Sequence, residues 1–188
     1  MLVHIKSEYT VEPSNEAEGG FSFTLRDVIP YTKDLGGYEK ACENEKRFDI
    51  SNWAFFIAFD ADGNPCDAVQ GDSRSHLPGT PIGAITMAAQ TQGVDMLDGR
   101  SDLAVLWDLR VREEYRQLGL GTRLFTAAVQ WARQEGYKQL KIECQNNNVA
   151  ACRFYQRQGA ILKEVNKGAY ADDPALKDEV QLIWYLDL

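Results

Sequence analysis

The sequence has little cysteine and little histidine, and neither residue forms a familiar ligand pattern. The chain has 188 residues, so it is too long to need disulfide staples, and its cysteines include no Cys-x-x-Cys pair. The two histidines, His4 and His76, lie far apart with no partner motif, so the sequence indicates neither a metal site nor histidine catalysis. We expect reduced thiols at all four cysteines: Cys42, Cys66, Cys144 and Cys152.

The sequence also lacks a long apolar run and an excess of basic residues. Glu8, Glu12, Glu16 and Glu18 lie where a signal peptide would need an uninterrupted apolar run, and no apolar stretch is long enough to cross a membrane, so we expect a cytoplasmic protein. The formal net charge of −8 argues against a nucleic-acid partner, because affinity for phosphate backbones rests on clustered Lys and Arg. The charge favours a cationic partner, although an acidic surface also simply keeps a protein in solution.

The overall composition is that of a globular domain. The chain is 44% hydrophobic and 26% charged, and it is long enough to bury a substantial core. No internal repeat or low-complexity tract interrupts it. We therefore expect one domain over residues 1–188.

Hydrophobic periodicity predicts a series of strands with two clear helices in the second half of the chain. The helices are expected at 121–135 and 149–158, each followed by a glycine, and one or two short helices are expected within 31–48. Residues 60–65 read as a turn and 66–81 as an irregular excursion, whose role is left open. The expected strands are 1–5, 21–29, 52–59, 81–90, 103–111, 140–144, 161–165 and 180–186.

The order of these elements predicts a mixed α/β sheet. Strands 81–90 and 103–111 should form an antiparallel pair, and the continuous apolar run at 103–106 is typical of a central strand buried on both faces. Strand 103–111, the helix at 121–135 and strand 140–144 form a strand–helix–strand unit, which should cross over right-handedly. Two parallel strands would therefore lie side by side at the centre of the sheet.

A glycine-containing loop follows the central strand. Gly119 and Gly121 can bring the backbone close to a ligand, and the free N–H groups at the start of the next helix can face an anion. Arg116 adds a cation beside them. The loop is not a nucleoside-triphosphate loop, which needs Gly-Lys-Ser/Thr, and it is not a dinucleotide fingerprint, because Leu124 stands where a third glycine is required.

The pattern Arg116-x-x-Gly119-x-Gly121 after a strand resembles the acetyl-coenzyme A loop of the GNAT superfamily of N-acetyltransferases. A second segment is similar to the other GNAT signature, Asn-x-x-Ala-x-x-x-Tyr-x-x-x-Gly-Phe. The chain departs from it at Ala160, where phenylalanine is usual, which affects local packing more than chemistry. Two motifs in the right order are much stronger evidence than either alone. The second motif matches at Asn148, Ala151, Tyr155 and Gly159.

The resemblance implies a single-domain GNAT-like fold, with a splayed central sheet flanked by helices and acetyl-CoA between its two parallel strands. Backbone groups of the first strand would then bind the pantetheine, and loop amides would bind the pyrophosphate, with Arg123 as a further phosphate contact. Asn148 would cap a helix and could also bind the pantetheine. The cofactor-binding residues that the resemblance implies are Leu109, Arg110, Val111, Arg116, Gln117, Leu118, Gly119, Leu120, Gly121, Thr122, Asn148 and Ala151.

The implied reaction is attack of a neutral amine on the acetyl thioester, without an acyl-enzyme. Tyr155 matches the family position that protonates the departing thiolate. Asp108 is the candidate proton acceptor, with a structural or substrate-binding role as the alternative. The base assignment is open, because Trp107 stands where many relatives carry glutamate; Asp102, Glu143 or a water relay are the other candidates.

Within the superfamily the chain most resembles the streptothricin acetyltransferases, the antibiotic-modifying branch. The matching segments are Pro30-Tyr31-x-Lys33-Asp34, 147–152 and the Trp184-Tyr185 ending. The resemblance implies a small cationic amine as substrate. An acidic pocket is favoured by the acidic residues near the first expected helices: Asp27, Asp34, Glu39, Glu43 and Asp49. The alternatives are acetylation of a protein N-terminus or lysine, and a coenzyme-binding module without turnover. A homodimer paired through the aromatic C-terminal strands is also left open.

Overall fold

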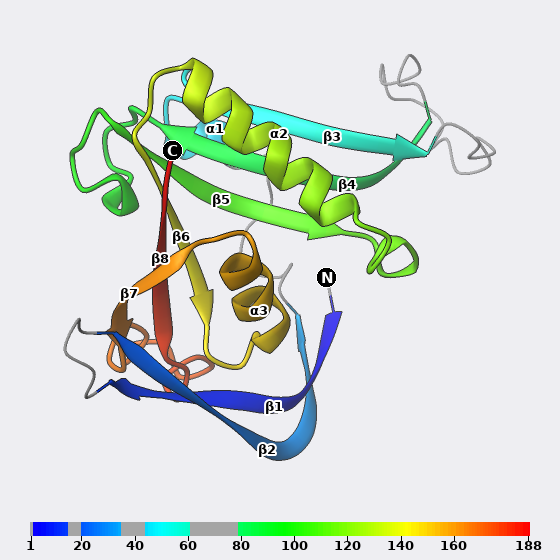
Figure 1. Ribbon diagram of the computed structural model, residues 1–188, viewed down its shortest axis with the longest axis vertical. Helices are drawn as coiled ribbons and strands as arrows, with labels where there is room; N and C mark the ends of the chain where they lie inside the picture. The colour runs from blue at the N-terminus through cyan, green and yellow to red at the C-terminus, as the bar shows by residue number, and fades with distance from the viewer. Residues whose placement is uncertain (1, 15–19, 35–43, 61–78) are drawn as a thin grey trace.

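The computed structural model describes residues 2–14, 20–34, 44–60 and 79–188 (Figure 1). Its main sheet has six strands in the order β3-β4-β5-β6-β8-β7, and a separate two-stranded sheet pairs β1 with β2. The mixed α/β fold is therefore confirmed. The strands of the main sheet are β3 (Ala54–Asp60), β4 (Thr80–Ala89), β5 (Leu103–Val111), β6 (Gln139–Gln145), β7 (Ile161–Asn166) and β8 (Gln181–Asp187).

The centre of the sheet is the parallel pair β5 and β6, as the sequence predicts. Their ladder has only four residue pairs, from Leu103↔Gln139 to Leu106↔Ile142. Beyond Leu106 the two strands no longer pair, although β5 stays paired with β4 as far as Val111. The sheet is therefore splayed at the carboxyl end of these strands, the edge at which ligands bind in many α/β folds.

A β-bulge lies where the two strands separate. Thr86 and Met87 are adjacent on β4, but their partners on β5 are Asp108 and Leu106, so Trp107 is the extra residue. A bulge bends its strand and redirects the side chains around it. The bulge therefore marks the point at which β5 turns away from β6.

Two helices cover this sheet. Helix α2 (Leu120–Gln134) packs against β3, β4 and β5, and α3 (Val149–Arg157) lies beside β6 and β1 (Figure 1). The buried face of α2 comprises Leu124, Phe125, Ala128, Val129 and Ala132, close to the apolar stripe predicted from its 3.6-residue period. Phe125 meets Phe154 of α3 edge to face at 5.7 Å, so the two helices are in contact across the splay.

A second buried cluster lies against the sheet, separate from the main core. It gathers Trp53, Ala88, Val94, Leu97 and Val105, with Trp107 packed against it. Two short elements lie near this cluster, α1 (Asn44–Arg47) and the 3-10 turn η2 (Asp95–Leu97), whereas the 3-10 turn η3 (Glu113–Tyr115) follows β5. The central strand is therefore buried by side chains of both clusters, as the apolar run at 103–106 predicts.

Strands β1 (Leu2–Pro13) and β2 (Phe21–Asp34) form a long hairpin that runs beneath α3 and the β6–β8 half of the sheet (Figure 1). The prediction of short helices within 31–48 is wrong at residues 31–34, which continue β2 beyond Pro30. Proline is tolerated because residues 28–30 bulge outward opposite Lys6, between the pairs Ile5↔Tyr31 and Ser7↔Asp27. Residues 44–47 form the one described helical turn of that segment, and residues 35–43 lie outside the described residues.

The remaining predicted elements agree with the structure to within one or two residues at each end, except that β1 and β2 are longer than predicted. Strand β8 has β6 and β7 on its two edges, whereas β7 lies at the edge of the sheet, and pairing of the C-terminal strands between subunits stays a prediction. No helix in the described residues is long and apolar enough to span a membrane. The excursion at 66–78, His76, Cys42 and Cys66 lie outside the described residues.

Candidate active site

The loop after β5 opens helix α2 with an uncapped N-terminus. Gly119 is the N-cap residue, with a left-handed φ of +80°, and no side chain caps this end. The first intrahelical bond runs from the Arg123 N–H to the Gly119 carbonyl at 3.1 Å, so the amides of Leu120, Gly121 and Thr122 have no acceptor within the helix. Three free N–H groups at the positive end of a helix dipole are suited to bind an anion.

The predicted cofactor residues of the loop and of β5 are brought together in space. A Cβ built on Gly121 would lie 3.8 Å from the Phe154 ring and 4.0 Å from Val111, so the start of α2 touches both β5 and α3. Gln117 has a positive φ of +62°, and the side chain of the next residue, Leu118, is 73% exposed. The loop is therefore held in an unusual backbone path next to the splay.

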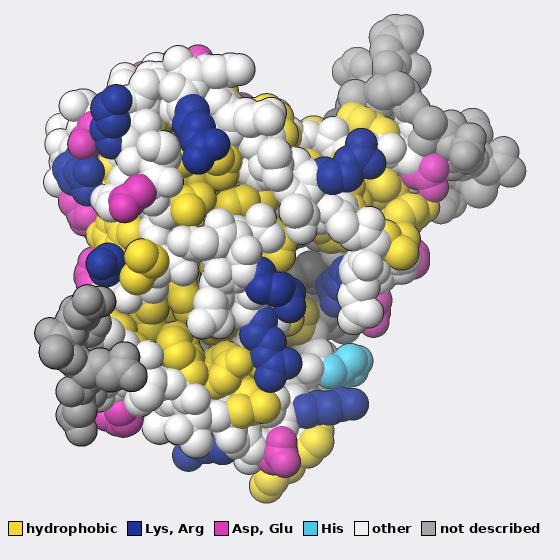
Figure 2. Space-filling model, in the orientation of Figure 1, with side chains coloured by type: hydrophobic (Ala, Val, Ile, Leu, Met, Phe, Trp, Pro, Cys, Tyr) yellow, Lys and Arg dark blue, Asp and Glu magenta, His cyan; other side chains and the backbone are white. Residues whose placement is uncertain are grey.

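Three arginines surround a shallow depression beside this loop. The depression has a volume of about 520 Å³, and its lining includes Arg110, Arg112 and Arg116 together with residues 81–84 of β4. Arg116 is fixed by its own chain, since its Nε donates to the Val111 carbonyl at 3.2 Å. Figure 2 shows Lys and Arg side chains at the rim of a hollow between the two halves of the molecule. Arg112, which is not among the predicted cofactor residues, also lines this depression.

Helix α3 presents the second motif. Asn148 caps it, with its side-chain oxygen accepting from the Ala151 N–H at 3.2 Å, as predicted. Tyr155 points into the core, with 6% of its surface exposed and its ring 5.5 Å from Phe154. No described residue hydrogen-bonds its hydroxyl. The Cys144 and Cys152 thiols, predicted to be reduced, are free and lie 3.6 Å apart beneath the helix.

The environment of Tyr155 keeps its phenol protonated. Burial raises the pKa of the Tyr155 hydroxyl well above its usual range, and the nearby charges of Cys144 and Asp108 raise it further. Tyr155 and Asp108 are therefore within electrostatic reach of each other, although they lie on α3 and β5. The phenol is an available proton donor at neutral pH.

Asp108 follows the bulge and is held by its neighbour. Its Oδ1 accepts from the Arg110 Nε at 2.8 Å, and both side chains are 34% exposed. Trp107 points to the second buried cluster, where its ring packs 5.0 Å from that of Trp53. Its indole nitrogen is buried without a hydrogen-bond partner among the described residues. Trp107 therefore contributes packing where a relative would place glutamate.

The other base candidates have different partners. Asp102 forms a two-point ion pair with Arg100, at 2.9 and 3.1 Å, and its hydrogen bonds from Arg100 lower the pKa of its carboxyl. Asp102 also precedes β5, at the opposite end of that strand from the splay. Glu143 lies on the splayed part of β6, where the Tyr170 hydroxyl donates to it at 2.5 Å. Glu143 is thus closer to the site than Asp102, but its carboxylate already accepts a hydrogen bond from Tyr170.

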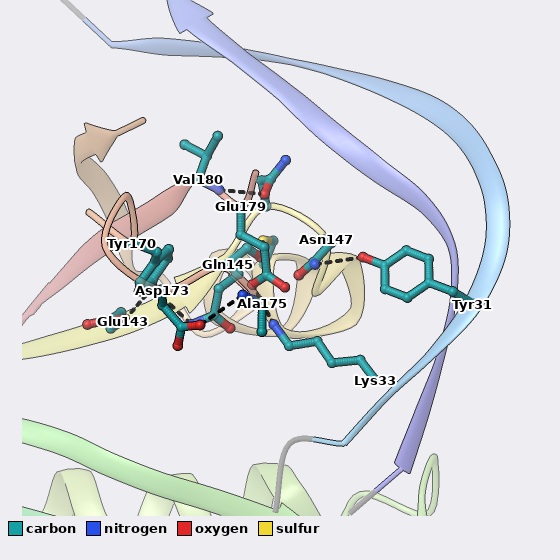
Figure 3. Close-up of polar contacts among 12 residues, drawn as sticks. Tyr31, Lys33, Glu143, Gln145, Asn147, Tyr170, Asp173, Ala175, Glu179 and Val180 are labelled. Atoms are coloured by element: carbon teal, nitrogen blue, oxygen red, sulfur yellow. Dashed lines mark hydrogen bonds and ion pairs between the residues drawn. The ribbon is translucent and has the colours of Figure 1, made fainter. Parts of the chain in front are cut away.

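The sequence interpretation missed a polar cluster beside β6 (Figure 3). Tyr170 accepts from Gln145 at 3.0 Å and donates to Glu143, and burial raises its pKa well above the usual range. Asn147 donates to the Tyr31 hydroxyl at 2.8 Å, across 116 positions in the sequence. Tyr31 and Asn147 lie in two short segments that resemble the streptothricin branch, and this was the one signal available in the sequence.

The family comparison decides the assignment. The model of the family described as "Acetyltransferase (GNAT) family" matches residues 32–160, more than half of the chain. The chain belongs to the GNAT acetyltransferase family. Members of this family use acetyl-CoA as cosubstrate. The recognition made from the two motifs is therefore confirmed.

Relatives of this GNAT chain include streptothricin acetyltransferases. Streptothricin acetyltransferase A of Bacillus subtilis (strain 168) is 33% identical over 82 residues, which cover 44% of this chain and 47% of that protein. The streptothricin acetyltransferase of Escherichia coli is 29% identical over 85 residues, covering 45% and 49%. The chain thus spans about half the length of the curated relatives that it matches.

Solved structures extend the likeness over the whole GNAT chain. A candidate streptothricin acetyltransferase from Bacillus anthracis str. Ames, in complex with acetyl coenzyme A, has a TM-score of 0.74 and 26% identity, and the match covers 100% of this chain and 89% of that one. A nourseothricin acetyltransferase has a TM-score of 0.68 at 21% identity, covering 99% and 86%, which bears on the fold alone.

The residues at the splay fit acetyl-CoA chemically. The free N–H groups of α2 and the arginines around the depression are donors suited to phosphates. No protein atom lies within 4 Å of a Cβ built on Gly119, so the space in front of this loop is open. The unpaired edge of β5 leaves backbone groups free to bind an extended chain.

Proposed function

We propose that this protein transfers an acetyl group from acetyl-CoA to a primary amine of a small cationic molecule. The observation that carries the proposal is the placement of Tyr155 on α3, where its ring packs 6.4 Å from Phe125 and 5.5 Å from Phe154 and no described residue hydrogen-bonds its hydroxyl. A phenol with no protein acceptor keeps its O–H group available to donate a proton to a bound ligand. Its place in the second motif supports a role at the thioester.

In this proposal the chain holds the donor and orients two reactants. The N–H groups of 120–122 and the side chain of Arg116 bind the diphosphate, and the free edge of 109–111 binds the pantetheine. Gln117, Leu118 and Gly119 shape the loop around the phosphates, and Asn148 and Ala151 contribute at the start of α3. Acetyl-CoA supplies an activated carbonyl, so positioning provides most of the rate gain.

The chemistry then needs one proton acceptor and one proton donor. The neutral amine attacks the carbonyl carbon, forming the C–N bond, and the C–S bond breaks. Asp108 accepts the proton that the amine nitrogen loses, directly or through water, and Tyr155 donates a proton to the departing sulfur. The products are the acetamide and coenzyme A. The raised pKa of Tyr155 agrees with a protonated donor at neutral pH.

A streptothricin-type antibiotic is the proposed acceptor. Two relatives named streptothricin acetyltransferase support it, as does the formal net charge of −8, since an acidic protein attracts a polycationic molecule. Of the acidic residues predicted to form a pocket, Asp34 lines a cavity, whereas Glu39 and Glu43 lie outside the described residues.

The test is a thiol-release assay with acetyl-CoA and a panel of amines: streptothricin, aminoglycosides, polyamines and peptides. We expect release with streptothricin above the rate without an acceptor. Release with peptides alone would replace the proposal with acetylation of a protein N-terminus or lysine. Binding of acetyl-CoA with no release for any amine would instead support a binding module.

A further inference from the structure

A second pocket lies away from the depression beside α2. It has a volume of about 360 Å³ and opens between the end of β2 and the segment at 175–179. Tyr31 and Lys33 line it from β2, and Glu179 lines it from the segment before β8. The two sides are joined by an ion pair of 2.5 Å between the Lys33 ammonium and the Glu179 carboxylate. Their side chains are only 10% and 11% exposed.

The side chain of Asn147 adds a buried acceptor without a partner. Asn147 is 3% exposed, and its amide nitrogen donates to the Tyr31 hydroxyl. Its Oδ1 is buried and has no hydrogen-bond partner among the described residues. Leaving a buried carbonyl unpaired is unfavourable, so such an atom indicates a missing donor. Figure 3 shows this amide directed toward Tyr31, in the same group as Glu179 and Lys33.

The polar groups in the pocket, and Asn147 directly behind its lining residue Tyr31, are mainly acceptors. The Asn147 carbonyl and the Glu179 carboxylate accept hydrogen bonds only, and the Tyr31 hydroxyl, which already receives one from Asn147, retains an acceptor lone pair. An ammonium group donates three hydrogen bonds and carries the matching charge. The pocket already holds one ammonium, that of Lys33, which shows that its electrostatics accept a cation.

The pocket lies next to the start of helix α3, because its lining residue Tyr31 is hydrogen-bonded to Asn147. Asn147 directly precedes Asn148, which caps the helix that carries Tyr155. The Glu143–Tyr170 hydrogen bond lies on the same splayed end of β6. A ligand held in this pocket would therefore lie near the start of the helix that carries Tyr155.

We propose that this pocket holds a second, non-reacting ammonium of the acceptor, so that the substrate class is a molecule with at least two amino groups. This rests on the proposed acetyl transfer. The reacting nitrogen must be neutral to attack, whereas the anchored nitrogen stays charged. The incoming ammonium competes with Lys33 for Glu179, which makes Lys33 a determinant of affinity.

Two variants that break the same ion pair test the proposal. Steady-state kinetics with acetyl-CoA compare cadaverine with pentylamine, which has the same carbon chain but lacks the second ammonium. Glu179→Gln should raise KM for cadaverine about tenfold, because it removes the carboxylate, and Lys33→Met should lower it severalfold, because it removes the competitor. Neither should change KM for pentylamine or for acetyl-CoA by more than about twofold.

The opposite signs separate recognition from structure. A merely structural ion pair would make both variants shift KM in the same direction, and that result would overturn the proposal, as would equal KM values for the two amines in the wild-type protein. Asn147→Asp, nearly the same shape with an added charge, should also lower KM for cadaverine. Thermal unfolding of each variant checks that it is folded.

A binding measurement keeps this inference distinct from the acetyl-transfer proposal. Titration calorimetry of cadaverine and of pentylamine into the protein with coenzyme A needs no turnover. Selective binding of cadaverine, weakened by Glu179→Gln, supports the pocket even if no acetyl transfer occurs. Turnover of amines without that selectivity leaves the transferase proposal standing and overturns the pocket.

Discussion

The Nε of Arg110 lies 2.8 Å from the Oδ1 of Asp108, just beyond the last residue pair that joins β5 to β6. The two residues are next but one on the strand, so their side chains share one face. Both are about one third exposed, at 34%, so solvent screens the pair and it is easily opened. An approaching amine could therefore take the place of Arg110 beside the carboxylate.

Replacement of Asp108 tests this arrangement. We expect Asp108→Asn to lower kcat for the best amine about tenfold, because the amide cannot accept the proton that the amine loses. KM for acetyl-CoA should be unchanged. The matched control, Asp102→Asn, alters a carboxylate that is paired with Arg100 at the opposite end of β5 and should retain most of kcat. If Asp108→Asn instead raises only the KM of the amine, Asp108 binds substrate and is not the base.

Replacement of Tyr155 tests the proton donor. Tyr155→Phe should leave the affinity for acetyl-CoA nearly intact and lower kcat at least about tenfold, since only the hydroxyl is lost. Tyr185→Phe is the matched control, because the Tyr185 hydroxyl bonds the exposed Glu164 at 3.0 Å, away from the splay. An unchanged kcat in Tyr155→Phe would refute the role.

Alanine substitutions at two glycines of similar backbone geometry can distinguish an effect on ligand binding from an effect of backbone strain. Gly119 has a φ of +80° and Gly136 a φ of +84°, and a Cβ on either one meets no protein atom within 4 Å. Alanine at either position should therefore cost about 1 kcal/mol of stability. Only Gly119→Ala should also weaken acetyl-CoA binding, by about tenfold in Kd, measured by calorimetry. Equal Kd values in both variants would place the diphosphate elsewhere.

The alkaline stability of the protein should report the buried phenol. Burial raises the pKa of Tyr155, so above about pH 10 the unfolded chain loses this proton while the folded protein keeps it. The free energy of unfolding therefore falls as the pH rises through that range. Tyr155→Phe should lose less stability than the wild type between about pH 8 and 11 in urea unfolding. Phe154→Leu, which leaves the phenol in place, should follow the wild-type slope.

The central part of the fold could be predicted because its signals are local. The strand Leu103–Val111 was predicted to the residue, since an apolar run is followed at once by a charged turn. Asn148 was predicted as a cap because its role depends only on the next three residues. The segment 31–34 was predicted wrongly, because Pro30 normally ends a strand and the bulge that accommodates it depends on β1.

The candidate site was predictable in part for the same reason. The loop and the second motif are short patterns, so their residues could be assigned from the sequence. The pair Tyr31 and Asn147, and the pair Lys33 and Glu179, join positions 116 and 146 apart. Such contacts depend on how the hairpin β1–β2 folds beneath α3, which no local pattern encodes. Partners of this kind are visible only in three dimensions.

Within the six-stranded sheet, strands β3, β4 and β5 are joined to strands β6, β8 and β7 only by the four residue pairs between β5 and β6. A short ladder allows the two parts of the sheet to move relative to each other. A molecule bound in the gap beyond the ladder would contact both parts and restrict that movement. Bound acetyl-CoA would then stabilise the relative position of the two parts of the sheet, in addition to being a reactant. Amide hydrogens at the unpaired ends of β5 and β6 should exchange more slowly when acetyl-CoA is bound.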